Sequence, residues 1–271
     1  MLLDVRLFWV AFWLYFAGFL SYLMWLMLNK KIVSTLALSA MIIGFIPHTV
    51  AIILRWIEAG HGPFYNMFGY MSIMAWTSVL IFMLLMYFTK KTLIGVFLSP
   101  VSFLLIACAS VLPKDLSYQL VPALQSTWFY IHVIMSIFGE GAFAVAFGVS
   151  VMYLVGSHMQ NKNKLSDKFP SLEALDEINY KAISVGYPLF TVGALIAGSI
   201  WAARAWGAYW SWDSKEVGAL IIWFFYTIYL HARYVKGWQG NKAAWMSIIG
   251  FIVTLLSFFG NQFLGGLHAY V

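Results

Sequence analysis

Apolar residues fill long runs along this chain, and short polar clusters separate one run from the next. About eight of the runs reach the roughly 20 residues that an α-helix needs to cross the hydrocarbon core of a bilayer. The pattern therefore predicts a polytopic transmembrane helical bundle with about eight spanning helices. The expected spans are 7–28, 32–54, 67–88, 93–112, 128–155, 182–203, 217–235 and 243–263.

The polar segments between these runs are too short to form a soluble domain. The longest extends from Gly156 to Tyr180 and mixes Lys with Asp and Glu, which predicts a solvated connector with a short surface helix over Leu172–Ile178. The first run has no small-residue cleavage site, so we interpret it as a retained helix and not as a signal peptide. We expect a single integral membrane domain over 1–271, with N-terminal helices in 1–124 and a second half in 125–271.

Composition narrows the fold class further. Hydrophobic residues make up 62% of the chain and charged residues 10%, whereas a soluble domain has roughly 45–50% and about 25%. A chain this apolar needs lipid around most of its surface, and α-helices satisfy their own backbone hydrogen bonds there. We therefore expect an all-α protein in a lipid bilayer. The formal charge of +6 then reflects topology, and no nucleic-acid partner is expected.

The basic residues predict an orientation. Lys and Arg accumulate in cytoplasmic loops, and 11 of the 16 in this chain lie on one side of the predicted spans. That side is cytoplasmic if both termini are extracytoplasmic, which is the topology we expect. The five on the outer side are Arg6, Arg55, Lys114, Arg204 and Lys215.

Several reaction classes are excluded by what the chain lacks. Cys108 is the one cysteine and lies in an apolar run, so an internal disulfide, a CxxC redox pair and a cysteine-based metal site are ruled out. We interpret Cys108 as a small buried hydrophobic residue. The sequence has no P-loop, metalloprotease helix motif or nucleophile elbow, and ATP hydrolysis by this chain is not expected.

Residues 201–216, here called the tryptophan loop, hold four tryptophans and one tyrosine within twelve positions. The rings are Trp201, Trp206, Tyr209, Trp210 and Trp212, and the polar residues Asp213, Lys215 and Glu216 follow them. An interfacial belt of Trp and Tyr is one interpretation. The density favours another, in which the rings form a flat apolar surface for a large planar ligand. Arg204 or Lys215 would then bind the carboxylates of that ligand.

The histidines add metal-binding chemistry to this surface. His132, at the outer end of the fifth span, and His268, in the C-terminal tail, both fall on the predicted side of the tryptophan loop. Each alone is typical of an interfacial histidine, but two beside a flat aromatic surface fit the two axial nitrogens of a haem iron. His231 lies near the inner end of the seventh span and would be half of a bis-histidine site. His48 is poorly placed to complete that site, because it is expected in the outer half of the bilayer.

Glu140 lies two turns below His132 on the same helical face. An ionised carboxylate at that depth is costly, so we expect a neutral group or one that faces a polar cavity. A structural acid and a role in a proton relay or ligand channel both remain open. His61 and His158 are interpreted as a loop residue and a solvated cytoplasmic residue.

Three blocks of sequence carry a resemblance to a known family. The tryptophan loop resembles the WWD signature of haem-handling proteins, and residues 125–271 resemble the CcsA/ResC family of system II cytochrome c biogenesis. The blocks are Trp206–Glu216, then His231-Ala-Arg233 with Gly237-Trp238, then Asn261 to Tyr270. In the N-terminal half the likeness rests on hydropathy and on residues 62–68. This chain has Gly69 and Tyr70 where the family often has a glutamate.

The resemblance implies a role in haem transport and cytochrome c-type biogenesis. Such a protein moves haem b to the extracytoplasmic face of a bacterial cytoplasmic membrane, or of a thylakoid-type membrane, and presents it to the CxxCH motif of apocytochrome c. It would be the haem-presenting subunit of a cytochrome c synthase, or haem lyase. A CcsB/ResB-like membrane subunit and thiol-reducing proteins of the same pathway are the implied partners.

The same resemblance implies residue roles. His132 and His268 would be the outer axial ligands, and His231 would be one ligand of an intramembrane site whose second ligand comes from the partner. The tryptophan loop, with Asp213, would hold the haem edge. The alternatives are a CcmC-type haem delivery protein without synthase activity, a redox subunit with fixed bis-histidine haems, and a solute transporter.

Overall fold

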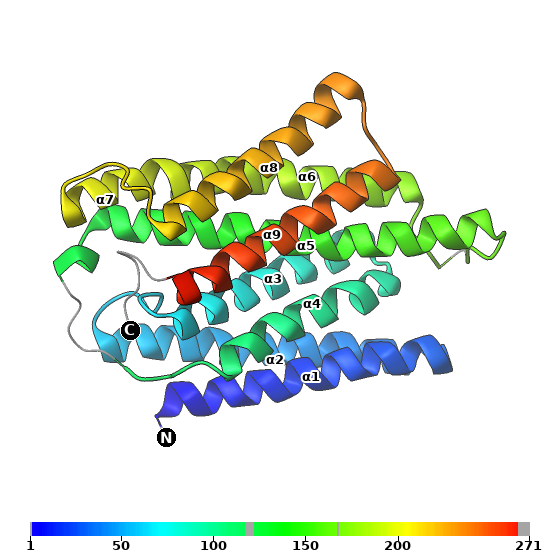
Figure 1. Cartoon of the computed structure of the whole chain (residues 1–271). Helices are drawn as coiled ribbons and strands as arrows, with labels where there is room; N and C mark the ends of the chain where they lie inside the picture. Colours follow the sequence, from blue (N-terminus) through cyan, green and yellow to red (C-terminus); the bar gives the residue numbers. More distant parts are fainter. Residues whose placement is uncertain (1, 117–121, 167, 265–271) are drawn as a thin grey trace. The chain divides into compact units, whose positions relative to one another are not determined.

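The computed structural model of this chain describes residues 2–116, 122–166 and 168–264. Within these residues the regular structure is helical, as expected. The α-helices are α1 (Leu3–Leu28), α2 (Lys31–Ala59), α3 (Met67–Thr89), α4 (Thr92–Ser110), α5 (Thr127–Asn161), α6 (Leu172–Phe190), α7 (Gly198–Trp206), α8 (Ser214–Lys236) and α9 (Asn241–Leu264). A 3₁₀ turn, η1 (Pro122–Leu124), precedes α5, and a π-helix, η2 (Thr191–Ala197), joins α6 to α7 (Figure 1).

Seven helical segments among the described residues are long and apolar enough to cross a membrane, and one of them is the continuous 35-residue segment of α6, η2 and α7. Helix α8 is the remaining long segment, with 23 residues, and His231 and Arg233 lower its hydropathy. Each of the eight predicted spans thus corresponds to one helical segment. The chain is an all-α integral membrane protein.

The described residues form two compact units. The first contains the helices before residue 117 together with the segment 166–170. In it α1 packs against α2 and α4, and α3 packs against α4 and α2. The short segment of the connector returns to the turn between α1 and α2, where Lys168 Nζ donates to Asn29 Oδ1 at 2.5 Å.

The second unit contains α5 and all helices from α6 onward. Helices α5 and α6 lie side by side, and α9 packs against both α5 and α8 (Figure 1). A Cβ on Gly139 would be 2.9 Å from the carbonyl oxygen of Gly186, and the reverse distance is the same. These two glycines therefore allow the backbones of α5 and α6 to approach closely, which is the usual packing of small residues between membrane helices.

The predicted helix over Leu172–Ile178 is present, but it is not a short, separate surface helix. These residues are the first two turns of α6, which continues without a break to Phe190. Leu175, Asn179 and Ile183 repeat at helical spacing and are buried, so the packed face of α6 begins well before the apolar run that the hydropathy pattern detects. A polar outer face hides such a helix start from a count of apolar residues.

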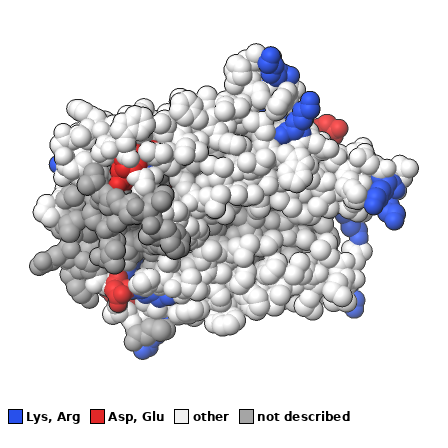
Figure 2. Space-filling model, in the orientation of Figure 1, with Lys and Arg blue, Asp and Glu red and all other residues white. Residues whose placement is uncertain are grey.

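Charged side chains lie near the ends of the helices. Figure 2 shows Lys, Arg, Asp and Glu gathered at the ends, while the surface between them carries almost no charge on the face drawn. This distribution fits helices whose middle parts are surrounded by lipid.

Candidate functional site

His132 is held in one orientation by a backbone carbonyl. It lies in the second turn of α5, partly exposed, and its Nδ1 is 2.9 Å from the carbonyl oxygen of Gly193 in η2. A carbonyl oxygen only accepts, so Nδ1 carries the proton and donates it. In the neutral form of the ring the lone pair is then on Nε2, and this arrangement is typical of histidines that bind metals.

The π-helix places the Gly193 carbonyl where it can serve two donors. Gly193 O also accepts from the backbone N–H of Gly198, five residues later, so both lone pairs of the oxygen are in use. A Cβ on Gly193 would be 2.5 Å from the backbone nitrogen of Ser136, and one on Gly198 would be 3.0 Å from His132 Nδ1. Both glycines are therefore needed for α5 and η2 to approach this closely.

Trp201 supports the His132 ring from one face. The two rings are stacked with centroids 5.6 Å apart and an interplanar angle of 9°. Trp201 is only 1% exposed, and its other ring neighbours are Phe129 at 5.5 Å and Trp206 at 4.9 Å. The inner part of the tryptophan loop is thus a packed aromatic cluster around His132.

The outer part of the loop presents its rings to the surroundings. Trp212 is 71% exposed and Tyr209 is 68% exposed, and Trp210 meets Trp212 edge to face at 5.7 Å. Trp212 has a φ of +60°, a left-handed conformation that is an outlier for a bulky side chain. Such strain occurs mainly at binding and catalytic sites. Arg204 and Lys215, the two predicted partners for ligand carboxylates, are both exposed.

Asp213 caps helix α8, a role that our sequence analysis missed. Its Oδ1 accepts from the backbone N–H of Lys215 at 2.9 Å, and Glu216 Oε2 accepts from the backbone N–H of Asp213 at 3.3 Å. The two residues form a capping box and also secure Ser211, whose backbone N–H donates to Glu216 Oε2 at 2.7 Å. An acidic residue followed three positions later by Glu, just before an apolar run, is the signal that identifies such a cap.

His231 lies far from His132 along the second unit. His132 lies in the second turn of α5, at the end of the second unit where α8 begins (Figure 1), and His231 is 17 positions after Ser214, the first residue of α8. At 1.5 Å per residue this is roughly 26 Å along the helix axis. The His231 side chain is exposed, on the same stripe as Phe224, Ile228 and Val235. The two histidines therefore lie toward opposite ends of the second unit.

The end of α8 that carries His231 is tied to α6. Arg233 Nη2 lies 2.7 Å from Asp176 Oδ2, and its Nη1 lies 2.9 Å from Asp176 Oδ1. Deeper in the unit, Asn179 Nδ2 lies within hydrogen-bonding distance of Ser150 Oγ and Ser247 Oγ, and the Tyr229 hydroxyl donates to Asn179 Oδ1. This buried network, which joins four helices, was also missed, because Asn179 lies in the polar segment that precedes the apolar run of this span.

The other candidate residues are placed as follows. His48 is fully buried between Tyr15 and Ser72 in the first unit. Glu140 is buried in α5, at 7% exposure. His61 lies in the loop after α2, as expected, but its side chain is buried, with its Nδ1 3.2 Å from Gly62 O. His158, near the far end of α5, is exposed. His268 lies outside the described residues.

No cluster of three His, Cys, Asp or Glu that could hold a metal ion occurs in the described part of the chain.

Comparison with known proteins gives consistent matches. The family model of the cytochrome c assembly protein matches residues 64–268. The cytochrome c biogenesis protein CcsA of Guillardia theta is 35% identical over 274 residues, which cover 93% of this chain and 91% of that protein. The CcsA protein of Prochlorococcus marinus (strain NATL2A) is 38% identical, with 82% of this chain and 80% of that protein covered.

A solved structure shares the fold. The cytochrome c heme lyase CcmF superimposes with a TM-score of 0.72 at 17% sequence identity, and the match covers 97% of this chain and 48% of that chain. This chain thus corresponds to about half of the larger protein. With the sequence matches above, the likeness leads to one conclusion: the chain belongs to the cytochrome c assembly protein family and, within it, to the CcsA proteins of cytochrome c biogenesis.

Proposed function

We propose that this chain presents haem b at the extracytoplasmic face of the membrane for covalent attachment to the CxxCH motif of apocytochrome c. It would act with a CcsB/ResB-like subunit as the haem-presenting part of a cytochrome c synthase. Haem is the substrate in this proposal, and thiol-reducing proteins of the pathway keep the apocytochrome thiols ready to react. The membrane would be a bacterial cytoplasmic or a thylakoid-type membrane.

The observation that carries the proposal is the setting of His132. Its Nδ1 donates to Gly193 O at 2.9 Å and its ring stacks on the buried Trp201. The hydrogen bond selects the tautomer that has a lone pair on Nε2, and it raises the basicity of that nitrogen. These are the properties that an axial ligand of haem iron needs. The proposed second ligand is His268.

The exposed rings fit the flat faces of the same substrate. Trp212 and Tyr209 offer apolar area, while Arg204 and Lys215 on the same loop offer positive charge for the two propionates. Trp201 is buried behind His132, so in this proposal it orients the ligand and does not touch haem. Asp213 holds the loop through the cap of α8.

The chemical step needs positioning more than acid or base groups. Each thioether bond forms when a cysteine S–H adds across one haem vinyl group, with the sulfur and the hydrogen both retained in the product. A ligand that fixes the haem orientation beside the two thiols supplies much of the rate, because misplacement by about 1 Å costs on the order of 100-fold. His132 would provide this orientation.

His231 belongs to a second haem position in this proposal. It is exposed on an apolar stripe of α8 and lies roughly 26 Å along the helix from the His132 end. We propose that the partner subunit covers this stripe and supplies the other axial ligand. Haem would occupy this site before it reaches the tryptophan loop.

The test compares two histidines of one helix. Cells that express this chain with its partner and a CxxCH substrate should lose covalent cytochrome c by about 100-fold in His132→Ala. His158→Ala is the matched control, because His158 is exposed on α5 away from the site, and it should behave as wild type. Equal cytochrome yields in both variants would refute the role of His132. Haem delivered to the outer face without any covalent product would favour the CcmC-type alternative.

A further inference from the structure

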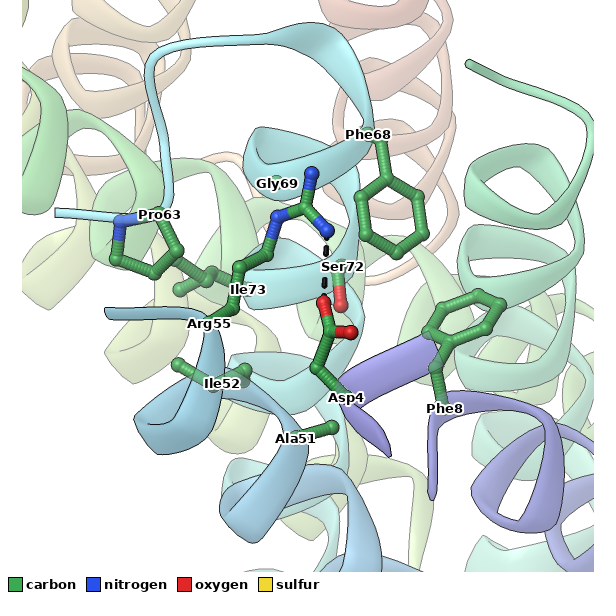
Figure 3. Close-up of a pocket in the computed structure, with 10 residues that line it drawn as sticks. All are labelled: Asp4, Phe8, Ala51, Ile52, Arg55, Pro63, Phe68, Gly69, Ser72 and Ile73. Atoms are coloured by element: carbon green, nitrogen blue, oxygen red, sulfur yellow. Dashed lines mark hydrogen bonds and ion pairs between the residues drawn. The ribbon is translucent and has the colours of Figure 1, made fainter. Parts of the chain in front are cut away.

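The first unit contains a small, mainly apolar cavity with a buried ion pair in its wall, which the proposed function does not use. Arg55 in α2 and Asp4 in α1 are 3% and 2% exposed, and Arg55 Nη1 donates to Asp4 Oδ2 at 2.8 Å. Figure 3 shows this pair beside Ser72 of α3, with the rings of Phe8 and Phe68 beyond Ser72 on the same side. All five residues line the cavity.

Two polar atoms of the ion pair have no hydrogen-bond partner among the described residues. They are Asp4 Oδ1, an acceptor, and Arg55 Nε, a donor, and both are buried. The other guanidinium nitrogen, Arg55 Nη2, is saturated by the carbonyl oxygens of Lys114 at 3.0 Å and Asp115 at 2.8 Å. A buried unmade hydrogen bond to a charged group is costly, so a ligand with both a donor and an acceptor fits here.

The size of the cavity selects the ligand. The volume open to the centre of a water molecule is about 10 Å³, close to the minimum of roughly 10–15 Å³ for one water. One water molecule therefore matches this volume, and buried waters typically bind two to four polar groups. Asp4 Oδ1, Arg55 Nε and Ser72 Oγ provide a suitable set.

Ser72 extends the polar groups into the middle of the unit. Its Oγ is 3.0 Å from His48 Nε2, and His48 Nδ1 is 3.2 Å from the Tyr15 hydroxyl. If Tyr15 donates to Nδ1, then Nε2 donates to Ser72, and the serine proton is available to the cavity. In the opposite tautomer Ser72 donates to Nε2 and accepts from the cavity, so either arrangement connects His48 to it.

On the other side of the ion pair, Arg55 is hydrogen-bonded to the loop after α4. Lys114 Nζ donates to the carbonyl oxygens of Ser110 and Leu112 and lies over the rings of Phe8 and Phe68. Burial, and next the positive charge of Arg55, lower the pKa of Lys114. Arg55 Nη2 donates to the carbonyl oxygen of Asp115, a residue of the same loop that is exposed. The Asp4–Arg55 pair is therefore hydrogen-bonded to a loop that reaches the surface.

We propose that the cavity binds one water molecule, held by Arg55 Nε and Asp4 Oδ1, and that this water completes a hydrogen-bonded route through Ser72 to His48. Arg55 stays protonated and only holds the water, while the water, the Asp4 carboxylate and the Ser72 hydroxyl can pass a proton, so the fully buried His48 exchanges protons with the cavity water. An ionisable residue inside a membrane bundle with such a connection is a site of function by default. This site is independent of the haem proposal.

The water itself is tested in the wild-type full chain in lipid nanodiscs. X-ray hydroxyl-radical footprinting in H₂¹⁸O should oxidise Phe8 and Phe68, because radicals form on waters in contact with them. Phe82 is the control, since it is equally buried in the same unit and does not line this cavity. Labelling of Phe8 and Phe68 no greater than that of Phe82 would overturn the water site.

The route is tested by hydrogen–deuterium exchange at C2 of the His48 imidazole, which requires both protonation of the ring and access of solvent ions. Ser72→Ala should slow this exchange by roughly tenfold, the factor expected from loss of one hydrogen bond. Ser78→Ala is the matched control, because Ser78 is also a buried serine of α3 and bonds Ser102 at 2.9 Å. Exchange at the wild-type rate in Ser72→Ala would contradict the route. If that variant does not fold, an undetectable exchange of His48 in the wild type decides against it.

Discussion

Individual residues of the tryptophan loop serve two different purposes. Trp201 and Trp206 pack around His132, whereas Tyr209 and Trp212 face outward. The ring density identified the loop from the sequence, but a count of rings does not show which ones are buried. That division depends on where α5 and η2 approach one another, and the approach rests on glycines whose neighbours are distant in the sequence.

The close approach of Gly198 to His132 predicts the effect of a substitution at this glycine. A methyl group in Gly198→Ala would be 3.0 Å from His132 Nδ1, which forces the imidazole away from Gly193 O. We expect covalent cytochrome formation to fall by at least about tenfold, because a small displacement of a positioning ligand is costly. A Cβ in Gly260→Ala in α9 meets no atom of the described residues within 4 Å, and this variant should retain full activity. Full activity in Gly198→Ala would show that the position of the ring does not matter.

The strained backbone at Trp212 predicts a trade-off between stability and activity. A left-handed conformation costs a non-glycine residue about 1–2 kcal/mol, so Trp212→Gly should unfold at higher temperature than Trp212→Ala. Both variants remove the exposed ring and should lose haem retention to the same extent. Thermal unfolding followed by circular dichroism, together with haem content after purification, separates the two effects. Equal stability of Gly and Ala here would mean that the φ of +60° carries no strain.

At the level of secondary-structure elements, the sequence predicted the helices well and their special features poorly. The eight apolar runs match eight helical segments because hydropathy over about 20 residues reports burial in lipid directly. The π-helix η2 has no comparable local signal. Its extra residue is accommodated because Gly193 packs against Ser136 of α5, a contact between distant segments. The start of α6 was missed because its outer face is polar.

The cap of α8 predicts the outcome of two substitutions at Asp213. Asp213→Ala removes the acceptor for the backbone N–H of Lys215 and should lower the free energy of unfolding by about 1 kcal/mol. Asp213→Asn keeps a good cap and should keep both stability and cytochrome formation, if holding the loop is the whole role of this residue. Loss of activity in a stable Asp213→Asn protein would instead assign the carboxylate a direct contact with haem. Chemical denaturation and the cytochrome assay are the two measurements.

At the level of the whole molecule, the membrane topology and the family followed from the sequence, because both rest on long patterns and on separated motifs. The described part of the chain then adds that His132 lies in the second turn of α5, whereas His231 lies roughly 26 Å along α8 from Ser214, the first residue of that helix. The single membrane domain, the extracytoplasmic placement of both termini and the partner subunit stay predictions. His268 lies outside the described residues, so its pairing with His132 is part of the proposal.

The most direct test of the central claim asks whether His132 is an axial ligand of haem. The complex of this chain with its CcsB/ResB-like partner is purified with haem, and His132→Met is compared with wild type by magnetic circular dichroism and redox titration. A thioether in place of an imidazole should give one haem a histidine–methionine signature and a higher reduction potential, while His158→Met should match wild type. An unchanged bis-histidine spectrum and potential in His132→Met would contradict the assignment.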